Sequence, residues 1–409
     1  MKWLRWNAFR LIALALFAVF ALGYVPESWR NANAILPRLS PLLNLGGALA
    51  ARQWIGWSML LGIPLLILPL FKGRLFCWRI CPMGFLAEQV GRLNPKGKGL
   101  IRRVPTVNKV LTLTILVTAA LGYPLLIWLD PLCIFNGFFA IWRTPMALLT
   151  SVTGIGFISI LVISVIAPNI WCHRLCPLGG LEEALMLFAK RFQKPAAGTA
   201  PAPQALTATS VGRRTVLAAL TAGIAGGVTR RVTASRRYAV IRPPSADVER
   251  FNALCARCGN CMKACPYQLI QPDLGESGID GLFTPVLKFR SQDDQQESYC
   301  FQDCTKCSQV CPTGALHPLT VEEKHARPIG LAVVDRKKCL AWAQNEFCVV
   351  CDEYCPYKAI IVEKHGEVMC PIVDPAKCRG CAACESACPG EPIAITVQPL
   401  AAKRYAPMR

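Results

Sequence analysis

Residues 255–266 of this chain read CARCGNCMKACP, and residues 378–389 read CRGCAACESACP. Both stretches space four cysteines as C-x2-C-x2-C-x3-C and close with a proline. In this arrangement a tight loop points three thiolates at one iron–sulfur cubane, and the fourth cysteine, next to proline, usually ligates the neighbouring cluster. The two stretches therefore predict a domain built around [4Fe–4S] clusters.

Two variants of this motif lie between them. One runs from Cys300 to Pro312 as C-x3-C-x2-C-x3-C-P, and the other runs from Cys339 to Pro356 as C-x8-C-x2-C-x3-C-P. At four thiolates per cubane, the four motifs predict four [4Fe–4S] clusters. The predicted iron ligands are Cys255, Cys258, Cys261, Cys265, Cys300, Cys304, Cys307, Cys311, Cys339, Cys348, Cys351, Cys355, Cys378, Cys381, Cys384 and Cys388.

Zinc and disulfides are the alternative uses of so many cysteines. Zinc ribbons use paired C-x2-C units, which leave the third cysteine, the fourth cysteine and the proline of each motif unexplained. A small disulfide scaffold is excluded by the length of 409 residues and by long apolar runs. Cys133 and Cys370 fit none of the motifs, and we interpret both as passive thiols.

The charge of the chain is unevenly distributed. Residues 1–229 hold 22 Lys and Arg against 5 Asp and Glu, whereas residues 230–409 hold 23 against 20. The excess in the apolar first half gathers in loops between apolar runs, where positive charge records membrane orientation. We therefore expect no nucleic acid partner, although the formal net charge is +20.

The apolar runs predict a membrane bundle, because a helix needs roughly 18 apolar residues to cross a bilayer core of about 30 Å. A fifth run, Val216–Val228, is shorter and predicts an anchor helix. Basic residues in the 72–109 loop place that loop on the cytoplasmic side. The four predicted spanning helices lie near residues 8–25, 53–71, 110–129 and 147–167.

The four helices look like a duplicated hairpin. Phe76–Leu86 (FCWRICPMGFL) recurs as Trp171–Leu181 (WCHRLCPLGGL), and Leu39–Leu42 is weakly echoed by Leu129–Leu132. Each strong copy carries a C-x3-C-P pair, and helical positions i and i+4 share one face. The two pairs could together supply four ligands for one further metal or cluster, or they are structural thiols that mark a partner surface. The four residues are Cys77, Cys81, Cys172 and Cys176.

These features divide the chain into four segments. Residues 1–191 form a four-helix transmembrane domain, and residues 192–210, rich in Ala, Pro and Thr, form a linker. Residues 211–229 form a signal or anchor segment, and residues 230–409 form an α+β polyferredoxin domain with two ferredoxin-like cluster pairs. Haem is not expected, because no C-x2-C-H occurs and no histidine lies in an apolar run.

The motifs carry a resemblance to two families. Residues 1–191 resemble NapH-type membrane ferredoxin proteins in their helices and C-x3-C-P pairs. The rest resembles NapG-type and MauM-type ferredoxins of periplasmic nitrate reductase and methylamine systems, in Arg213-Arg214 before an apolar run, in Ile241-Arg242-Pro243-Pro244 and in the motif at Cys255. The chain looks like a fusion of the two, without the two further ferredoxin motifs that follow the fourth helix in NapH-type proteins.

The resemblance implies a location. It implies a multi-pass protein of the bacterial inner membrane, in contact with lipid and the quinone pool. Arg213-Arg214 looks like a twin-arginine export signal, which would place the ferredoxin domain in the periplasm. The alternative is a cytoplasmic domain attached by an interfacial apolar segment.

The resemblance also implies a function. We expect a quinol dehydrogenase-type component that passes electrons from quinol through the four clusters to a periplasmic c-type cytochrome or terminal reductase. One alternative is a redox maturation or maintenance factor for a periplasmic cofactor-containing enzyme. Another alternative is a redox-sensing regulator.

Overall fold

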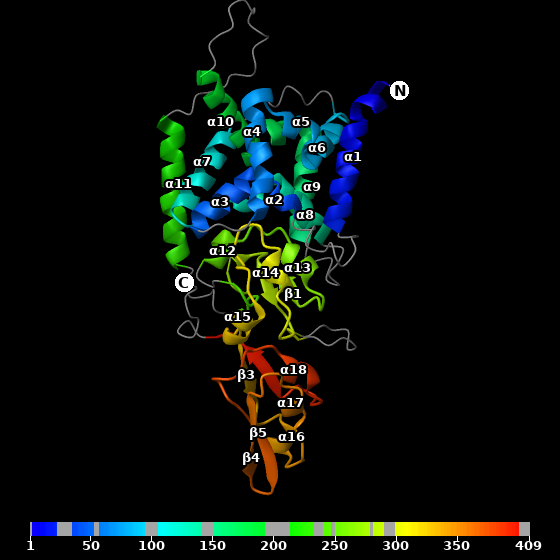
Figure 1. Ribbon diagram of the computed structural model, residues 1–409, viewed down its shortest axis with the longest axis vertical. Helices are drawn as coiled ribbons and strands as arrows, with labels where there is room; N and C mark the ends of the chain where they lie inside the picture. The colour runs from blue at the N-terminus through cyan, green and yellow to red at the C-terminus, as the bar shows by residue number, and fades with distance from the viewer. Residues whose placement is uncertain are drawn as a thin grey trace, which may run out of the picture. The chain divides into compact units, whose positions relative to one another are not determined.

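The computed structural model describes residues 2–22, 35–52, 57–94, 105–140, 151–192, 213–232, 240–246, 250–278, 281–289 and 299–400. The chain separates into two compact units. Unit 1 comprises residues 1–232, 253–258 and 312–314, and unit 2 comprises residues 233–252, 259–311 and 315–409. Within the described residues, unit 1 is helical and unit 2 carries the strands (Figure 1).

Helix α7 organises unit 1, because α3, α10 and α11 all pack against it, while α9 packs against α6 and α8 (Figure 1). Short 3-10 helices lie at Trp57–Gly62 (η2) and Ile127–Leu129 (η4), and a short π-helix lies at Trp171–Leu175 (η6). The helices are α1 (Lys2–Leu22), α2 (Ile35–Arg38), α3 (Pro41–Ala51), α4 (Ile63–Lys72), α5 (Leu75–Arg79), α6 (Pro82–Gly91), α7 (Asn108–Ala120), α8 (Pro131–Ala140), α9 (Ser151–Ile166), α10 (Pro177–Phe192) and α11 (Arg213–Val232).

The repeated sequences of unit 1 begin equivalent helices. The weak echoes start α3 and α8, directly after Ser40 and Asp130, and the C-x3-C-P pairs start α6 and α10. Each of these helices begins with proline, which suits the first helical position because its missing N–H needs no partner there. The core between the helices includes the fully buried Phe76, Phe135 and Met83.

The predicted membrane bundle of four spanning helices and a fifth anchor helix is wrong. Among the described residues, every helix falls short of the length or the apolar character that crossing a bilayer requires. The α-helices described within the runs at 53–71, 110–129 and 147–167 are α4, α7 and α9, of 10, 13 and 16 residues, and the 3-10 helix η2 precedes α4. At 1.5 Å per residue these helices reach about 15 to 24 Å, against a hydrocarbon core of about 30 Å.

Local sequence explains why the helices are shorter than the apolar runs. Gly122, with φ of 89°, and Pro124 follow the end of α7, so that helix stops within the predicted run. The longer helices carry basic residues, since α1 contains Lys2, Arg5 and Arg10, and α11 has paired arginines near both ends. The expected multi-pass location in the inner membrane is overturned by the same finding. Residues 193–210 of the predicted linker lie outside the described residues.

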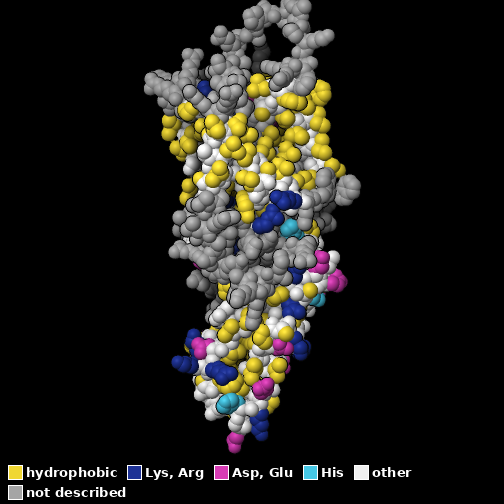
Figure 2. All heavy atoms as spheres, turned by 90° about the vertical axis from the view of Figure 1, so that its left-hand side faces the viewer, with side chains coloured by type: hydrophobic (Ala, Val, Ile, Leu, Met, Phe, Trp, Pro, Cys, Tyr) yellow, Lys and Arg dark blue, Asp and Glu magenta, His cyan; other side chains and the backbone are white. Residues whose placement is uncertain are grey.

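Apolar side chains are nevertheless frequent on the described surface of unit 1 (Figure 2). Phe9, Leu16, Phe71, Ile158 and Leu217 are each more than half exposed. Apolar patches of this extent usually mark interaction surfaces.

Unit 2 combines short helices with two-stranded antiparallel ribbons, in agreement with the α+β class predicted for this part. Strand β1 (Ile270–Pro272) pairs with β2 (Pro285–Leu287), and β4 (Ile360–His365) pairs with β5 (Val368–Val373). Strand β3 (Leu331–Val334) pairs with the distant β6 (Ile395–Gln398). After α12 (Phe251–Leu254), the helices are α13 (Asn260–Ala264), α14 (Lys306–Gln309), α15 (Val321–Ala326), α16 (Leu340–Ala343), α17 (Val350–Glu353) and α18 (Ala383–Ala387).

Candidate metal centres

The four C-terminal motifs share one local fold. In each motif the third cysteine lies in a short helix, and the fourth follows that helix and precedes proline. A residue before proline is held in extended backbone, and Cys265 and Cys388 accordingly have ψ of 114° and 118°. This backbone turns the fourth cysteine away from the loop that holds the first three. The third cysteines are Cys261 on α13, Cys307 on α14, Cys351 on α17 and Cys384 on α18.

The third motif and the last cysteine of the fourth motif line one pocket of unit 2. Cys339, Cys348 and Cys351 come from the third motif, and Cys388 comes from the fourth. Burial, followed by the charges of the other three cysteines, raises the pKa of Cys351 to about 12. The remaining walls are largely apolar, with Ile395 among them.

A second pocket shows the reverse exchange. Cys378, Cys381 and Cys384 of the fourth motif line it together with Cys355, the last cysteine of the third motif. Burial raises the pKa of Cys384 above its usual range, and the charges of the other three cysteines add to the rise. The third and fourth motifs thus exchange their last cysteines, as the ferredoxin spacing predicts.

The second motif receives its fourth thiol from the first motif. Burial raises the pKa of Cys307 above its usual range, and the charges of Cys300, Cys265 and Cys304 raise it further. These four cysteines therefore lie together in unit 2. The remaining predicted ligands are divided, since Cys255 and Cys258 belong to unit 1 and Cys261 and Cys311 belong to unit 2.

The donor chemistry of the three complete sets fits an iron–sulfur cubane. Thiols held together raise one another's pKa, because each thiolate repels the next, and bound iron supplies the positive charge that deprotonates them. No group of three or more His, Cys, Asp or Glu side chains among the described residues closes around a single metal ion. A cubane needs no such closure, because each of its thiolates binds a different iron.

Backbone donors also point at the sulfurs. The Ala359 N–H donates to Cys355 Sγ over 3.3 Å, and the Ala332 N–H donates to Cys378 Sγ over 3.5 Å. Hydrogen bonds of this kind disperse the negative charge of a thiolate and raise the potential of a cluster.

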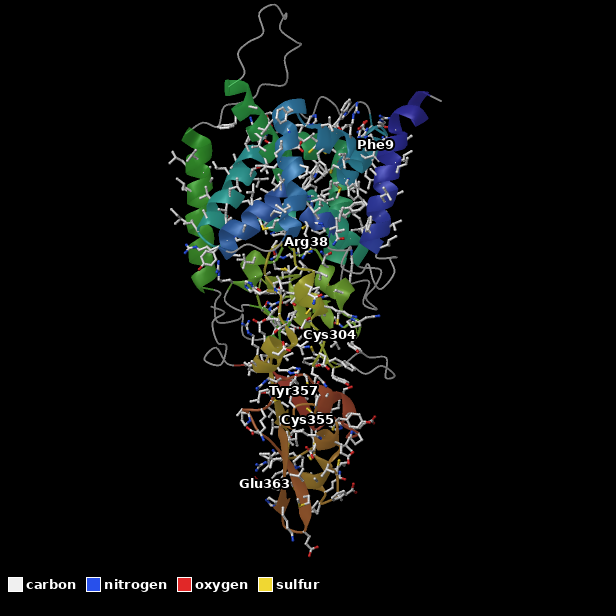
Figure 3. The ribbon with its side chains drawn as sticks, in the orientation of Figure 1. Phe9, Arg38, Cys304, Cys355, Tyr357 and Glu363 are labelled. Carbon is white, nitrogen blue, oxygen red and sulfur yellow. The ribbon has the colours of Figure 1, made fainter. Side chains whose placement is uncertain are left out.

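The second and fourth motifs meet inside unit 2. The Cys300 N–H donates to the Cys381 carbonyl over 2.8 Å. Burial raises the pKa of Tyr357, and the charges of Cys381 and Cys300 contribute to the rise, so this ring lies beside both motifs. In Figure 3, Cys304, Tyr357 and Cys355 follow one another along unit 2. The two cysteine sets are therefore neighbours.

Unit 1 brings its two C-x3-C-P pairs together. Burial raises the pKa of Cys81 above its usual range, and among the neighbouring charges that of Cys172 contributes most. A Cβ on Gly84 would lie 2.8 Å from the Cys77 carbonyl and 3.8 Å from Cys172 Sγ, so glycine permits this approach. Cys176 is affected in the same way by Cys81.

A buried carboxylate that the sequence did not single out adjoins these four cysteines. Glu182 on α10 is 1% exposed, and its Oε2 has no hydrogen-bond partner. Burial raises the pKa of Glu182 to about 7, although the hydrogen bond with Cys77 and the charge of Arg74 both act to lower it. The 95-residue repeat aligns Glu182 with Ala87. This difference between the two copies is the sequence feature that could have drawn attention to Glu182.

The two cysteines outside the motifs are both buried. Cys370 on β5 donates its thiol toward the Ala341 carbonyl at 3.6 Å. Cys133 on α8 lies against Cys258 within unit 1, and burial and that neighbour raise its pKa above the usual range.

Two family models match the chain. A model described as a 4Fe-4S dicluster domain matches residues 254–315, which hold the first two C-terminal motifs. A model described as a 4Fe-4S binding domain matches residues 54–103 and 150–195, which hold the two C-x3-C-P pairs.

The similar curated proteins are ferredoxin-type proteins. Methylamine utilization ferredoxin-type protein MauM of Methylobacillus flagellatus is 33% identical over 46% of this chain and 80% of its own length. Ferredoxin-type protein NapG of Haemophilus influenzae is 33% identical over 44% of this chain and 65% of its own length. NapG of Escherichia coli is 36% identical over 44% of this chain and 78% of its own length. No solved structure matches the chain. The NapH-type resemblance of residues 1–191 stays a prediction.

Proposed function

The chain belongs to the family of NapG- and MauM-type ferredoxin proteins, and on that premise we propose that it is an electron-transfer protein with four [4Fe–4S] clusters. The observation that carries the proposal is the exchange of fourth cysteines between motifs, which builds complete four-thiol sets in unit 2. Paired C-x2-C zinc sites leave the third cysteine and the proline of each motif unexplained. A cluster, when bound, accepts and releases one electron at a time.

Each cluster is assigned to three cysteines of its own motif and one of the partner motif. The residues hold the irons, keep water away and set the potential, whereas the redox chemistry belongs to the cofactor. The second cluster is assigned Cys300, Cys304, Cys307 and Cys265; the third Cys339, Cys348, Cys351 and Cys388; and the fourth Cys378, Cys381, Cys384 and Cys355. The remaining predicted ligands, Cys255, Cys258, Cys261 and Cys311, are assigned to the first cluster by the motif spacing alone.

The contacts of unit 2 support an order for electron movement. The hydrogen bond between the Cys300 N–H and the Cys381 carbonyl supports a second cluster that neighbours the fourth. The shared pockets of Cys388 with Cys339 and of Cys355 with Cys378 support a fourth cluster that neighbours the third. Electrons therefore pass between the second and third clusters through the fourth.

We further propose an electron donor and an electron acceptor for the clusters. The family resemblance supports a quinol, which releases two electrons and two protons, as donor. It supports a periplasmic redox protein, a c-type cytochrome or a terminal reductase, as acceptor. The clusters divide the electron pair into single transfers.

Anaerobically purified full-length protein tests the proposal. We expect about sixteen iron atoms and as many acid-labile sulfides per chain from the four cubanes, with electron paramagnetic resonance (EPR) signals of interacting clusters after reduction. Bound zinc without labile sulfide would rule the clusters out. Rapid cluster reduction by a short-chain quinol would support the donor, and reduction by dithionite alone would favour the maturation alternative.

We also propose one further iron–sulfur cluster in unit 1, held by Cys77, Cys81, Cys172 and Cys176, whose irons would add to those of the four cubanes. Support comes from the convergence of the two pairs and from the unpartnered, buried Glu182 oxygen beside them. Cys81→Ser and Cys176→Ser should each lower the iron content equally and leave the signals of unit 2 intact. Cys370→Ser, which removes a buried thiol outside all motifs, is the control. Unchanged iron in both variants would mark the four as structural thiols.

A further inference from the structure

Lys324 is a buried cation beside the second cluster's ligands. It lies on α15, is 4% exposed, and its Nζ donates to the carbonyls of Phe301 and Cys304, the latter over 2.7 Å. The Cys300 side chain lies close enough for the charge of Lys324 to act on it. The ammonium group of Lys324 is therefore directed at the second motif.

The local fold holds this ammonium in place. Thr320 and Glu323 close a capping box at the start of α15, where the Thr320 hydroxyl accepts from the Glu323 N–H and the Glu323 carboxylate accepts from the Thr320 N–H. The helix therefore begins at a defined residue, and Lys324 has a defined direction.

Stacked aromatic rings adjoin the same site. Phe301 stacks on Tyr267 and on Tyr299, with ring centroids 4.1 and 4.2 Å apart. A charge in such surroundings acts more strongly on its neighbours than a charge in water, because the local dielectric is lower. Burial raises the pKa of Cys300, and the charge and hydrogen bond of Lys324 oppose that rise.

We propose that Lys324 is a tuning residue that raises the reduction potential of the cluster held by Cys265, Cys300, Cys304 and Cys307. The inference rests on the proposed function, because it requires a cluster at that site. Reduction adds one negative charge to a cluster, and a fixed positive charge stabilises the reduced form more than the oxidised form. The Cys300 N–H also donates to the Cys381 carbonyl of the fourth motif. The cation therefore acts on the cluster that neighbours the fourth one, and it favours the reduced state of that cluster.

Redox titrations of the anaerobically purified full chain, followed by EPR, test this proposal. Lys324→Met should lower the reduction potential of one cluster. At a fixed potential, the ratio of reduced to oxidised cluster should fall at least tenfold, which corresponds to a shift of about 59 mV for one electron. Lys324→Arg should restore most of the shift, because it keeps the charge. Lys364→Met removes a charge from an exposed position on β4 and should leave all potentials unchanged.

The outcomes separate this inference from the proposed function. Wild-type protein without labile sulfide would overturn the proposed function, and the inference with it. Intact clusters in Lys324→Met with unchanged potentials would overturn the inference alone. If the variant does not fold, wild-type protein labelled with 15N-lysine decides the matter. Electron–nuclear double resonance should then detect one lysine nitrogen coupled to a reduced cluster, and its absence would refute the contact.

Discussion

The Ser40 hydroxyl donates a 2.5 Å hydrogen bond to Asp130 Oδ2, and this bond joins the two residues that precede the equivalent helices α3 and α8. Both side chains are fully buried. Asp130 Oδ1 accepts from the N–H groups of Leu132 and Cys133, which caps α8. The two copies of the repeat are thus tied together at their weaker echo.

Loss of the Ser40 hydroxyl should destabilise unit 1. Ser40→Ala leaves a buried carboxylate oxygen without its partner, which costs about 1–3 kcal/mol. The free energy of unfolding from urea titration measures the effect. Thr221→Ala is the control, because its exposed hydroxyl bonds only to carbonyls of its own helix, and an equal cost in both variants would contradict the prediction.

The same carboxyl predicts a dependence of stability on pH. Burial raises the pKa of Asp130 to about 6, against the hydrogen bonds from Ser40 and two backbone N–H groups. The unfolded chain has a pKa of about 3.9, so the folded state binds more protons between the two values. Stability should therefore fall as pH rises from about 4 to 6. Asp130→Asn should remove this component, and identical slopes for variant and wild type would disprove it.

Cys265 should behave as a ligand of the second motif. Cys265→Ser is expected to alter the same EPR signal as Cys304→Ser, because both residues lie in one four-thiol set. Each variant should lose up to about four irons per chain. A match between Cys265→Ser and Cys261→Ser instead would mean that the first motif keeps its own fourth cysteine.

Two glycines of unit 1 should respond oppositely to alanine. A Cβ on Gly180 would lie 2.5 Å from the Asn108 carbonyl, where α10 packs on α7, whereas nothing lies within 4 Å of a Cβ on Gly156. Gly180→Ala should cost about 1–3 kcal/mol through overpacking. Gly156→Ala should stabilise α9 by roughly 0.5–1 kcal/mol, since alanine favours helix. Thermal unfolding of both variants checks the opposite signs.

Arg242 should be a main support of unit 2. Its guanidinium is buried and donates to Thr284 Oγ1, the Pro285 carbonyl, Asn252 Oδ1 and Ser277 Oγ, at 2.7 to 2.9 Å. Arg242→Met leaves several buried acceptors unpaired and should cost about 3–5 kcal/mol. Lys288→Met, which breaks the exposed pair with Glu276, should cost at most about 1 kcal/mol. Similar unfolding midpoints for both variants would contradict this role.

The sequence predicted helices that are longer than those of the structure. The apolar run at 110–129 is long enough to span a bilayer, yet α7 ends at Ala120 because Gly122 and Pro124 follow it. A hydropathy average over many residues hides a single glycine or proline, but proline ends a helix because its ring clashes with the preceding turn and it has no N–H to donate. The two C-x3-C-P copies begin the equivalent helices α6 and α10, although Cys77 lies in the α-helix α5 and Cys172 lies in the π-helix η6.

The sequence by itself determined which cysteines form loops suited to a cluster, because the spacing within each motif acts through a few neighbouring backbone angles. The spacing also predicts that the fourth cysteine serves a neighbouring motif, but only the tertiary structure decided which motif that is. Cys388 joins Cys339, and Cys355 joins Cys378, because the third and fourth motifs pack against each other. The same holds for Lys324, whose ammonium group reaches the Cys304 carbonyl only because α15 folds back onto the second motif.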